Sequence, residues 1–215
     1  MGLPELTVKD VKEMFLYVSE QLKQNKEFLN KADRAIGDGD HGVGMSRGFE
    51  AVRQKLEEES YQNISEVLKA IGMTLLTSIG GASGVVFGTL FIGGAKRIGD
   101  QTSFDSRCLS AMLLGGTEAV KERGRAKLGD KTMIDALEPA AVAAKEHETS
   151  ILVESMKLAM EASREGMEKT KKMVARLGKA RPLGQRSLGH PDPGALSIYL
   201  ILKAMSEFVE ELMKT

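Results

Sequence analysis

Apolar residues recur every three or four positions along most of this chain, and that periodicity is the strongest constraint on its fold. Near the start, Val11, Phe15 and Val18 share one face of a helix, and Thr7 and Asp10 before them have capping-box spacing. No segment alternates apolar and polar residues as a strand does. Helices are predicted over residues 8–22, 45–58, 65–75, 81–98, 109–122, 133–146, 152–177 and 194–213. We therefore predict an all-α bundle of about eight helices, folded as a single domain over residues 1–215.

Composition narrows the class of protein. The 30 basic residues balance the 30 acidic ones, which argues against nucleic-acid binding through a strong positive field. Cys108 is the single cysteine, so no disulfide can form within the chain, as is usual in a reducing compartment. The most apolar stretch, residues 84–95, is too short to span a bilayer, and no signal peptide is recognisable. We expect a soluble, cytoplasmic protein with neither a membrane nor a nucleic-acid partner.

Asp33, Asp38 and Asp40 are the residues that most strongly indicate a function. These three carboxylates and His41 lie within nine residues, interleaved with glycines. Clustered anions repel one another and are costly to bury unless something neutralises them. A hard divalent cation such as Mg²⁺ prefers carboxylate oxygen and is usually shared with the phosphates of a substrate. The segment therefore predicts a site for a metal and a nucleotide.

A loop is needed to bring the three carboxylates together. Successive helical residues advance by about 100°, which would leave neighbouring aspartates of this segment roughly 140–160° apart. Gly37, Gly39 and Gly42 would supply the backbone freedom that such a loop needs. The alternative is a solvated acidic turn in which an aspartate caps the following helix.

Two better-known motifs do not fit this segment. The glycines match the dinucleotide-binding pattern G-x-G-x-x-G, but residues 28–36 carry too many charges for the buried strand that must precede it. An EF-hand loop starting at Asp38 would place Gly42 at its fifth position and Phe49 at its twelfth, where oxygen ligands are required.

Two further loops are candidates for phosphate binding. The glycine-rich turn at residues 80–84 opens a helix, so either its bare N–H groups bind phosphate or its small residues allow close helix packing. The loop at residues 178–186 carries three cations in an irregular segment, so it either binds phosphate or is a solvated loop.

Two other loops have ordinary helix-capping explanations. Between residues 129 and 135, Asp130 or Thr132 is expected to cap a helix, with Met133 in the core. Before the last helix, Asp192 is expected to be the cap and Pro193 the first helical residue. Capping does not explain why so many such loops occur in one helical chain.

Taken together, and in this order, these segments resemble the nucleotide-binding L subunit of dihydroxyacetone kinases. The motifs are Asp33-(x4)-Asp38-Gly39-Asp40-His41-Gly42, Gly80-Gly81-Ala82-Ser83-Gly84, Gly129-Asp130-Lys131-Thr132-Met133 and Gly189-His190-x-Asp192-Pro193-Gly194-Ala195. The resemblance extends from about residue 10 to residue 210. It implies an antiparallel barrel of eight helices with the nucleotide at one end.

The resemblance also implies roles for individual residues. Asp33, Asp38 and Asp40 would hold two Mg²⁺ ions that bridge the phosphates of ADP or ATP. Residues expected to contact the nucleotide are His41, Gly42, Val43, Gly44, Ala82, Ser83, Gly124, Met133, Lys179, Asp192, Pro193 and Gly194. The family often has asparagine in place of Gly44 and arginine in place of Lys179. Gly44 therefore lacks a side-chain contact to phosphate, and either Lys179 or Arg181 supplies the charge.

The implied activity is phosphoryl transfer from the bound nucleotide to dihydroxyacetone held covalently on a separate K subunit. No base for the sugar hydroxyl is evident here, so the chain is expected to be inactive alone. Either ADP exchanges for ATP, or it stays bound and is rephosphorylated by a phosphocarrier M subunit of the phosphotransferase system. The second mode is favoured for a free-standing L subunit. A homodimer and contact with a transcription regulator are also expected from the family.

Three alternatives remain open at this point. The chain is a kinase subunit for another small keto-sugar, a nucleotide-binding regulatory subunit without catalysis, or a helical scaffold with a structural Ca²⁺ site. Three clustered carboxylates argue against a purely regulatory remnant, because a site without metal has no physical need for them.

Overall fold

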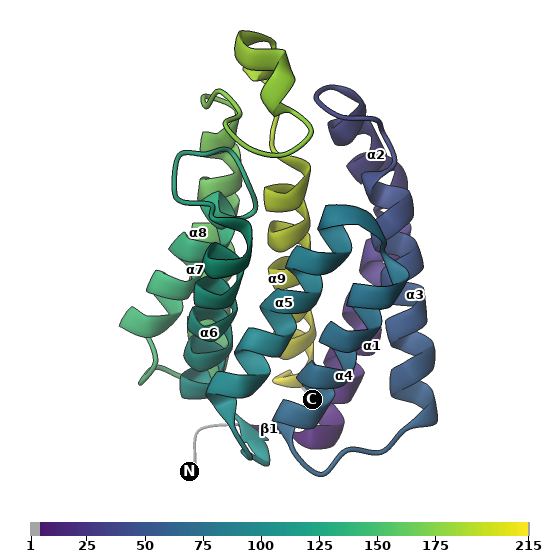
Figure 1. The fold of residues 1–215 in the computed structure, drawn as a ribbon. Helices are drawn as coiled ribbons and strands as arrows, with labels where there is room; N and C mark the ends of the chain where they lie inside the picture. Colours follow the sequence, from purple (N-terminus) through teal and green to yellow (C-terminus); the bar gives the residue numbers. More distant parts are fainter. Residues whose placement is uncertain (1–4, 215) are drawn as a thin grey trace.

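Nine α-helices, one 3₁₀ helix and a two-residue strand pair make up residues 5–214, the part of the chain that this computed structural model describes (Figure 1). The α-helices are α1 (Val8–Gln24), α2 (Lys26–Arg34), α3 (His41–Glu58), α4 (Ile64–Ser78), α5 (Gly81–Ile98), α6 (Ser106–Gly124), α7 (Ile134–Glu146), α8 (Leu152–Thr170) and α9 (Pro193–Leu212). The remaining elements are the strands β1 (Leu6–Thr7) and β2 (Ser103–Phe104) and the 3₁₀ helix η1 (Arg181–Ser187).

Eight of the helices form a closed antiparallel ring, so the predicted all-α barrel is confirmed. The ring runs from α1 through α3, α4, α5, α6, α7 and α8 to α9, which packs against α1 again. The helix α2 lies outside this ring and packs mainly on α3. Each helix runs opposite to the next one along the ring, so the connections fall alternately at the two ends of the barrel (Figure 1).

The structure differs from the sequence prediction at several helix boundaries. The helix α2 was not predicted, and α3 begins at His41, four residues before the predicted start. The cap of α4 is Asn63, whose side chain accepts a hydrogen bond from the Glu66 N–H at 2.9 Å, so this helix begins before the predicted residue 65, where Ser65 could have been the cap. The helix α8 ends at Thr170, well before the predicted residue 177.

The predicted capping box at the start of α1 is confirmed. The Asp10 N–H donates to the Thr7 hydroxyl at 3.2 Å, and the Thr7 N–H donates back to the Asp10 carboxylate at 2.8 Å. Leu6 and Thr7 also pair antiparallel with Phe104 and Ser103. This short pairing ties the start of the chain to the connection between α5 and α6, at the end of the barrel away from the aspartates (Figure 1).

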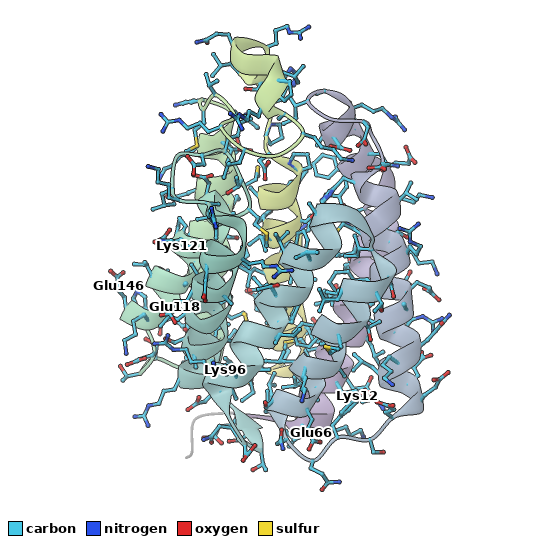
Figure 2. All side chains as sticks on the ribbon, viewed as in Figure 1. Lys12, Glu66, Lys96, Glu118, Lys121 and Glu146 are labelled. Carbon is cyan, nitrogen blue, oxygen red and sulfur yellow. The ribbon has the colours of Figure 1, made fainter. Side chains whose placement is uncertain are left out.

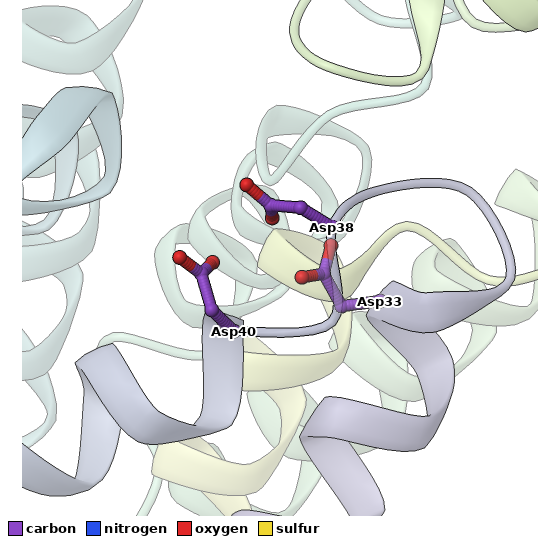
Figure 3. Close-up of side chains that lie close together, drawn as sticks. All are labelled: Asp33, Asp38 and Asp40. Carbon is purple, nitrogen blue, oxygen red and sulfur yellow. The ribbon is translucent and has the colours of Figure 1, made fainter.

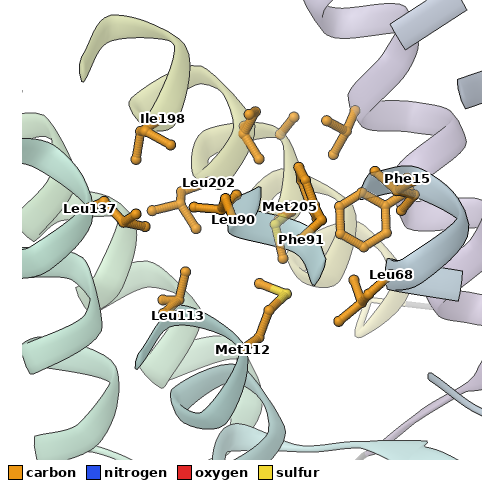
Figure 4. Close-up of a cluster of buried hydrophobic side chains, with 14 of the residues drawn as sticks. Phe15, Leu68, Leu90, Phe91, Met112, Leu113, Leu137, Ile198, Leu202 and Met205 are labelled. Carbon is orange, nitrogen blue, oxygen red and sulfur yellow. The ribbon is translucent and has the colours of Figure 1, made fainter. Parts of the chain in front are cut away.

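The inside of the ring is filled by one continuous apolar core. Figure 4 shows Phe15, Phe91, Met112, Leu137 and Met205 converging from five different helices of the ring. The rings of Phe15 and Phe91 meet edge to face, with centroids 5.5 Å apart. Burying these side chains contributes about 1.5–3 kcal/mol each, so the barrel is a rigid support for the loops at its ends.

The outer surface is charged and carries many ion pairs. Figure 2 shows charged side chains such as Lys96 and Glu118 pointing away from the barrel. Glu118 pairs with Arg97 at 2.6 Å, and Lys121 pairs with Glu138 at 2.8 Å. Exposed pairs of this kind contribute only about 0–1 kcal/mol each, so the core dominates the stability. Over residues 5–214, no helix is both long enough and apolar enough to cross a bilayer.

Candidate metal centre

Asp33 is the buried member of the aspartate cluster, at the C-terminal end of α2. Its carboxylate oxygen Oδ2 accepts hydrogen bonds from the N–H groups of Gly39 and His41, at 2.9 and 3.1 Å. These bonds fold the loop between α2 and α3 around the side chain. The other oxygen, Oδ1, accepts no hydrogen bond that we identify within residues 5–214 and is available as a ligand.

Asp38 and Asp40 complete the cluster from the same loop. One carboxylate oxygen from each of the three aspartates lies within 4.8 Å of the others. Figure 3 shows the three side chains meeting above the start of α3. Asp38 and Asp40 are exposed, so the cluster is open to solvent on one side. The predicted convergence of Asp33, Asp38 and Asp40 through a loop is therefore present in the structure.

Lys179 reaches this cluster from the connection between α8 and α9. Its ammonium nitrogen donates to Asp38 and lies 3.5 Å from an oxygen of Asp40. Hydrogen bonding to Lys179 lowers the pKa of Asp38, and the bond with Asp38 raises the pKa of Lys179. The Lys179 ammonium thus offsets the charge of the carboxylates that a divalent metal would otherwise neutralise. The three carboxylates offer only oxygen ligands, which fits Mg²⁺. Arg181, the alternative to Lys179, is exposed in η1.

Gly39 has the predicted role in this segment, whereas Gly42 does not. Gly39 has a φ of +80°, which L side chains rarely adopt, so it provides the turn. Gly42 lies inside α3, and its role is close packing against α2. A Cβ atom there would lie 2.0 Å from the carbonyl oxygen of Lys26 and 2.7 Å from Oδ1 of Asn30. The prediction that Gly42 gives the loop backbone freedom is therefore wrong.

His41 and Val43 occupy the first turn of α3, beside the aspartates. The His41 ring shares a 2.8 Å hydrogen bond with the hydroxyl of Ser197 on α9. Burial lowers the pKa of His41, although Asp33 and Asp40 oppose that shift, so the ring is neutral at pH 7. The Val43 N–H donates to the Asn30 side chain at 3.1 Å, while the Val43 side chain is exposed.

Gly44 lies one position further along this helix and is half-buried. A Cβ atom at this position would meet Cγ2 of Ile79 at 3.4 Å, an ordinary contact. A small side chain would therefore fit at this position, so packing does not explain why the residue is glycine.

The turn between α4 and α5 has both features predicted for its small residues, close helix packing and free N–H groups at a helix start. Gly84 is buried, and a Cβ atom there would lie 3.1 Å from the carbonyl oxygen of Leu75, so this glycine allows close packing. Ala82 is exposed and Ser83 half-buried, at the N-terminal end of α5 where N–H groups lack helical partners. Arg47 on α3 donates to the carbonyl oxygens of Ser78 and Ile79 and so fixes this turn.

The connection between α6 and α7 is held by Asp135. Its carboxylate accepts hydrogen bonds from the N–H groups of Gly129 and Thr132, at 2.6 and 2.7 Å. Of the two predicted caps, Thr132 bonds to the start of α7, because its hydroxyl accepts a hydrogen bond from the Ile134 N–H at 3.2 Å, whereas Asp130 accepts one from the Lys127 N–H at 3.0 Å. The residue directly before α7 is neither of these. That residue is Met133, which is buried as predicted. The helix begins at Ile134, and its first turn supplies the carboxylate that orders the loop.

Asp192 caps α9 as predicted, accepting a hydrogen bond from the Ala195 N–H at 2.8 Å, with Pro193 in the first turn. Burial, with a contribution from the neighbouring Asp135, raises the pKa of Asp192 to about 7. Gly194 lies against Met133, because a Cβ atom on Gly194 would be 3.3 Å from the Cβ of Met133. Gly124 is exposed at the end of α6, and no packing contact accounts for it.

Four residues that shape this end of the barrel were not predicted. Asn30 and Ser197 are buried polar residues on the inner faces of helices, and each bonds to the first turn of α3. Arg47 fixes the turn before α5, and Lys131 is buried behind Met133. A polar residue at an apolar helical position was the available signal for Asn30 and Ser197. Nothing in the local pattern distinguishes Lys131 or Arg47 from ordinary surface cations.

Comparison with known proteins identifies the family. The family model for the DAK2 domain matches residues 35–207, which include Asp38, Asp40 and the later site loops. This chain belongs to the DAK2-domain family. The expected relationship to dihydroxyacetone kinase L subunits is thereby confirmed.

Named relatives of this DAK2-domain protein agree with the assignment. The ADP-binding subunit of the PEP-dependent dihydroxyacetone kinase of Escherichia coli is 40% identical over 189 residues, covering 86% of this chain and 89% of the relative. The corresponding subunit of kinase 1 from Listeria innocua is 37% identical over 187 residues, covering 86% and 89%. Both names describe subunits of phosphotransferases.

A solved structure also matches over almost the whole chain. The dihydroxyacetone kinase of C. freundii, in complex with AMP-PNP and Mg²⁺, superposes with a TM-score of 0.75 at 25% identity. The match covers 96% of this chain and 35% of the kinase chain. The DAK2-domain protein thus corresponds to one part of a larger kinase.

Proposed function

We propose that this DAK2-domain protein is the nucleotide-binding subunit of a dihydroxyacetone kinase. In this proposal it binds ADP or ATP with two Mg²⁺ ions and transfers a phosphoryl group to dihydroxyacetone on a separate K subunit. The observation that carries the proposal is the group of three carboxylates within 4.8 Å, set between the first turn of α3 and Lys179. The names of its relatives, which are ADP-binding subunits, support it.

Each residue has a distinct part in the proposed reaction. Asp33, Asp38 and Asp40 would hold Mg²⁺, which would supply positive charge to offset the charge of the nucleotide phosphates. Lys179, which donates to Asp38 and lies 3.5 Å from Asp40, is the cation that would meet a phosphate placed beside the aspartates. His41, whose Nε2 shares a hydrogen bond with the Ser197 hydroxyl, would lie beside the phosphates in the first turn of α3.

The nucleotide is expected to lie between three loops at this end of the barrel. Ala82 and Ser83 would present N–H groups of the α5 terminus to a phosphate. Met133 and Gly194, which touch each other, would line the pocket on the adenine side together with Gly124. Asp192 and Pro193 would close it.

A partner must supply the acceptor. We find no side chain near the cluster, within residues 5–214, that is placed to act as a base for a sugar hydroxyl. Three exposed apolar side chains, Val43, Leu128 and Leu188, lie in the first turn of α3 and in the loops at this end. We assign them to contact with the K subunit, because the acceptor has to approach where the carboxylates are open. Contact with a phosphocarrier M subunit would require the same end.

The mode of resupply can be tested directly. Protein purified in Mg²⁺ would be denatured and its released nucleotide separated by chromatography. Nearly one ADP per chain after washing supports a held cofactor that is rephosphorylated by a phosphocarrier. An empty protein that binds ATP and ADP reversibly supports the exchanging kinase. A protein that binds neither nucleotide with Mg²⁺ contradicts the proposal.

A matched pair of variants separates catalysis from mere binding. Asp38→Ala should abolish phosphoryl transfer in the presence of a dihydroxyacetone-loaded K subunit, with unchanged helical circular dichroism. Asp100→Ala removes an exposed aspartate at the other end of the barrel and should transfer normally. Full transfer by Asp38→Ala would refute the role of the carboxylate cluster, whereas a wild-type chain that binds nucleotide but transfers nothing would favour a nucleotide-binding regulatory subunit. The same assay with other small keto-sugars on their own K subunits tests the alternative acceptor.

A further inference from the structure

Lys131 is a buried cation that the proposed chemistry does not use. Its side chain is only 1% exposed, although lysine is almost never fully buried in folded proteins. It lies in the connection between α6 and α7, and its backbone has a φ of +60°, which is uncommon for a residue other than glycine. An unusual side-chain position and an unusual backbone therefore coincide at one residue.

The ammonium of Lys131 joins two other segments. It donates hydrogen bonds to the carbonyl oxygens of Thr170 and His190, both at 2.6 Å. Thr170 is the last residue of α8, where a positive charge is favourable, and its carbonyl oxygen also accepts a hydrogen bond from the Met173 N–H at 3.1 Å. His190 lies in the loop that leads into α9. One side chain thus satisfies backbone acceptors from two connections that are far apart in the sequence.

Other contacts reinforce the same junction. The hydroxyl of Thr170 accepts a hydrogen bond from the Asp192 N–H at 2.9 Å. The Gly189 N–H donates to the carbonyl oxygen of Lys171 at 2.8 Å. Asp192 and Asp135 are the acidic groups whose charge acts on Lys131, and they oppose the lowering of the Lys131 pKa that burial causes. The cation is therefore held by carbonyl oxygens and by two nearby carboxylates.

The segments joined by Lys131 carry the residues assigned to the nucleotide pocket. Met133 follows Lys131 by two residues, and Pro193 and Gly194 follow the His190 carbonyl by three and four. Met133 also lies close to Gly194, since a Cβ atom added to Gly194 would be 3.3 Å from the Cβ of Met133. Any loosening of the junction would separate these two walls of the pocket.

We propose that Lys131 is a positioning residue that keeps the two walls of the nucleotide pocket together and thereby slows nucleotide release. This inference rests on the proposed function, because it assigns Met133 and residues 192–194 to the pocket. It adds that retention of the nucleotide depends on a charge behind the pocket that does not itself touch the nucleotide.

Removing the charge of Lys131 should change the rate of nucleotide release more than the affinity for metal. In Lys131→Met, the carbonyl groups of Thr170 and His190 would lose their shared donor. We expect nucleotide to dissociate at least about tenfold faster, which corresponds to about 1.4 kcal/mol at 25 °C. The affinity for Mn²⁺ alone, measured by electron paramagnetic resonance, should stay within about twofold, because the aspartates are held by other contacts.

The experiment uses the full chain with a fluorescent ADP analogue and Mg²⁺. Dissociation is followed after adding excess unlabelled ADP, for the wild type, Lys131→Met and the control Lys172→Met. Lys172 is an exposed lysine close to the end of α8 and should release nucleotide at the wild-type rate when substituted. Equal rates for the wild type and a folded Lys131→Met would overturn the inference alone. A wild type that binds no nucleotide would overturn the proposed function and this inference with it.

A chemical rescue separates the charge from simple packing, and it applies even if Lys131→Met does not fold. Lys131→Cys in a Cys108→Ser background is alkylated while unfolded and then refolded. The aminoethyl reagent restores an ammonium at nearly the same distance, whereas an ethyl reagent adds carbon without charge. Slow release is expected only after aminoethylation. Equal rates after both reactions would show that Lys131 acts through volume and would refute a role for its charge.

Discussion

The close approach of α2 and α3 at Gly42 leads to a quantitative prediction for Gly42→Ala. A methyl group there would lie 2.0 Å from the backbone oxygen of Lys26, whereas real Cβ atoms essentially never approach within 3.0 Å. The helices must therefore separate by about 1 Å. Overpacking of this kind costs about 1–3 kcal/mol, against a gain of up to about 1 kcal/mol from replacing a helical glycine with alanine. The net expectation is a loss of stability of about 1–2 kcal/mol.

Gly44→Ala is the matched control, two residues further along the same helix. Its methyl group would meet Cγ2 and the carbonyl oxygen of Ile79 at 3.4 and 3.7 Å, which are ordinary contacts, so the gain in helix propensity should remain. We expect an increase of about 0.5–1 kcal/mol. The two variants therefore carry the same chemical change in the same helix and should shift the free energy of unfolding in opposite directions.

Urea denaturation without metal or nucleotide measures both changes, provided that the m-value stays constant. Gly42→Ala should also weaken Mn²⁺ binding, because displacement of α2 moves Asp33 and disturbs the bond between Asn30 and the Val43 N–H. If Gly42→Ala proved as stable as Gly44→Ala, the two helices would not be in the close contact described, and the explanation of Gly42 would be refuted.

Three further predictions follow from individual contacts. Lys179→Met should bind Mg²⁺ alone more tightly, as seen by calorimetry, but lose phosphoryl transfer, because the lysine competes with metal for Asp38 in the free protein; weaker Mg²⁺ binding would contradict this. The pKa of Asp192 is raised from 3.8 to about 7, which means that the folded protein binds this proton more tightly than the unfolded chain does. The resulting gain in folding stability is complete below pH 4 and is lost as the pH rises through 7. Asp192→Asn should flatten the dependence of stability on pH between 4 and 7, by up to about 1.4 kcal/mol per pH unit in urea titrations, and an unchanged slope would count against the burial of Asp192. Asn63→Ala should lower stability by about 1 kcal/mol through loss of the α4 cap, measured as a lower Tm, and an unchanged Tm would exclude this capping contribution.

The barrel could be predicted from the sequence because its helices have regular apolar faces. The helix α2 was missed because it has no such face. Of the residues in α2, Leu29 is buried together with the polar Asn30 and Asp33, while Phe28 is exposed. A face built from polar residues gives no hydrophobic periodicity. The strand pair at Leu6 is missed for a different reason, since two residues are too short to show alternation.

The site was predictable where its residues are close in sequence. Asp38 and Asp40 share a loop with the buried Asp33, and their convergence follows from local spacing. The contacts of Lys179 and Ser197 join residues more than 140 positions apart, and such pairings depend on how the ring closes. Lys131 could not be recognised as buried, because nothing near it in the sequence distinguishes a lysine that meets two carbonyl groups from one that meets water.

The alternation of connections in the ring has a practical consequence for work on this protein. Every connection that contributes to the site follows an even-numbered helix, whereas the segments at residues 59–63, 99–105 and 147–151 turn at the opposite end (Figure 1). Residues 59–63 and 147–151 are therefore the places to insert an epitope, graft a fluorescent reporter or open the chain for circular permutation, whereas residues 99–105 include β2 and its pairing with β1. A label attached at residues 147–151 would lie at the far end of the barrel and leave the open face free for the partner.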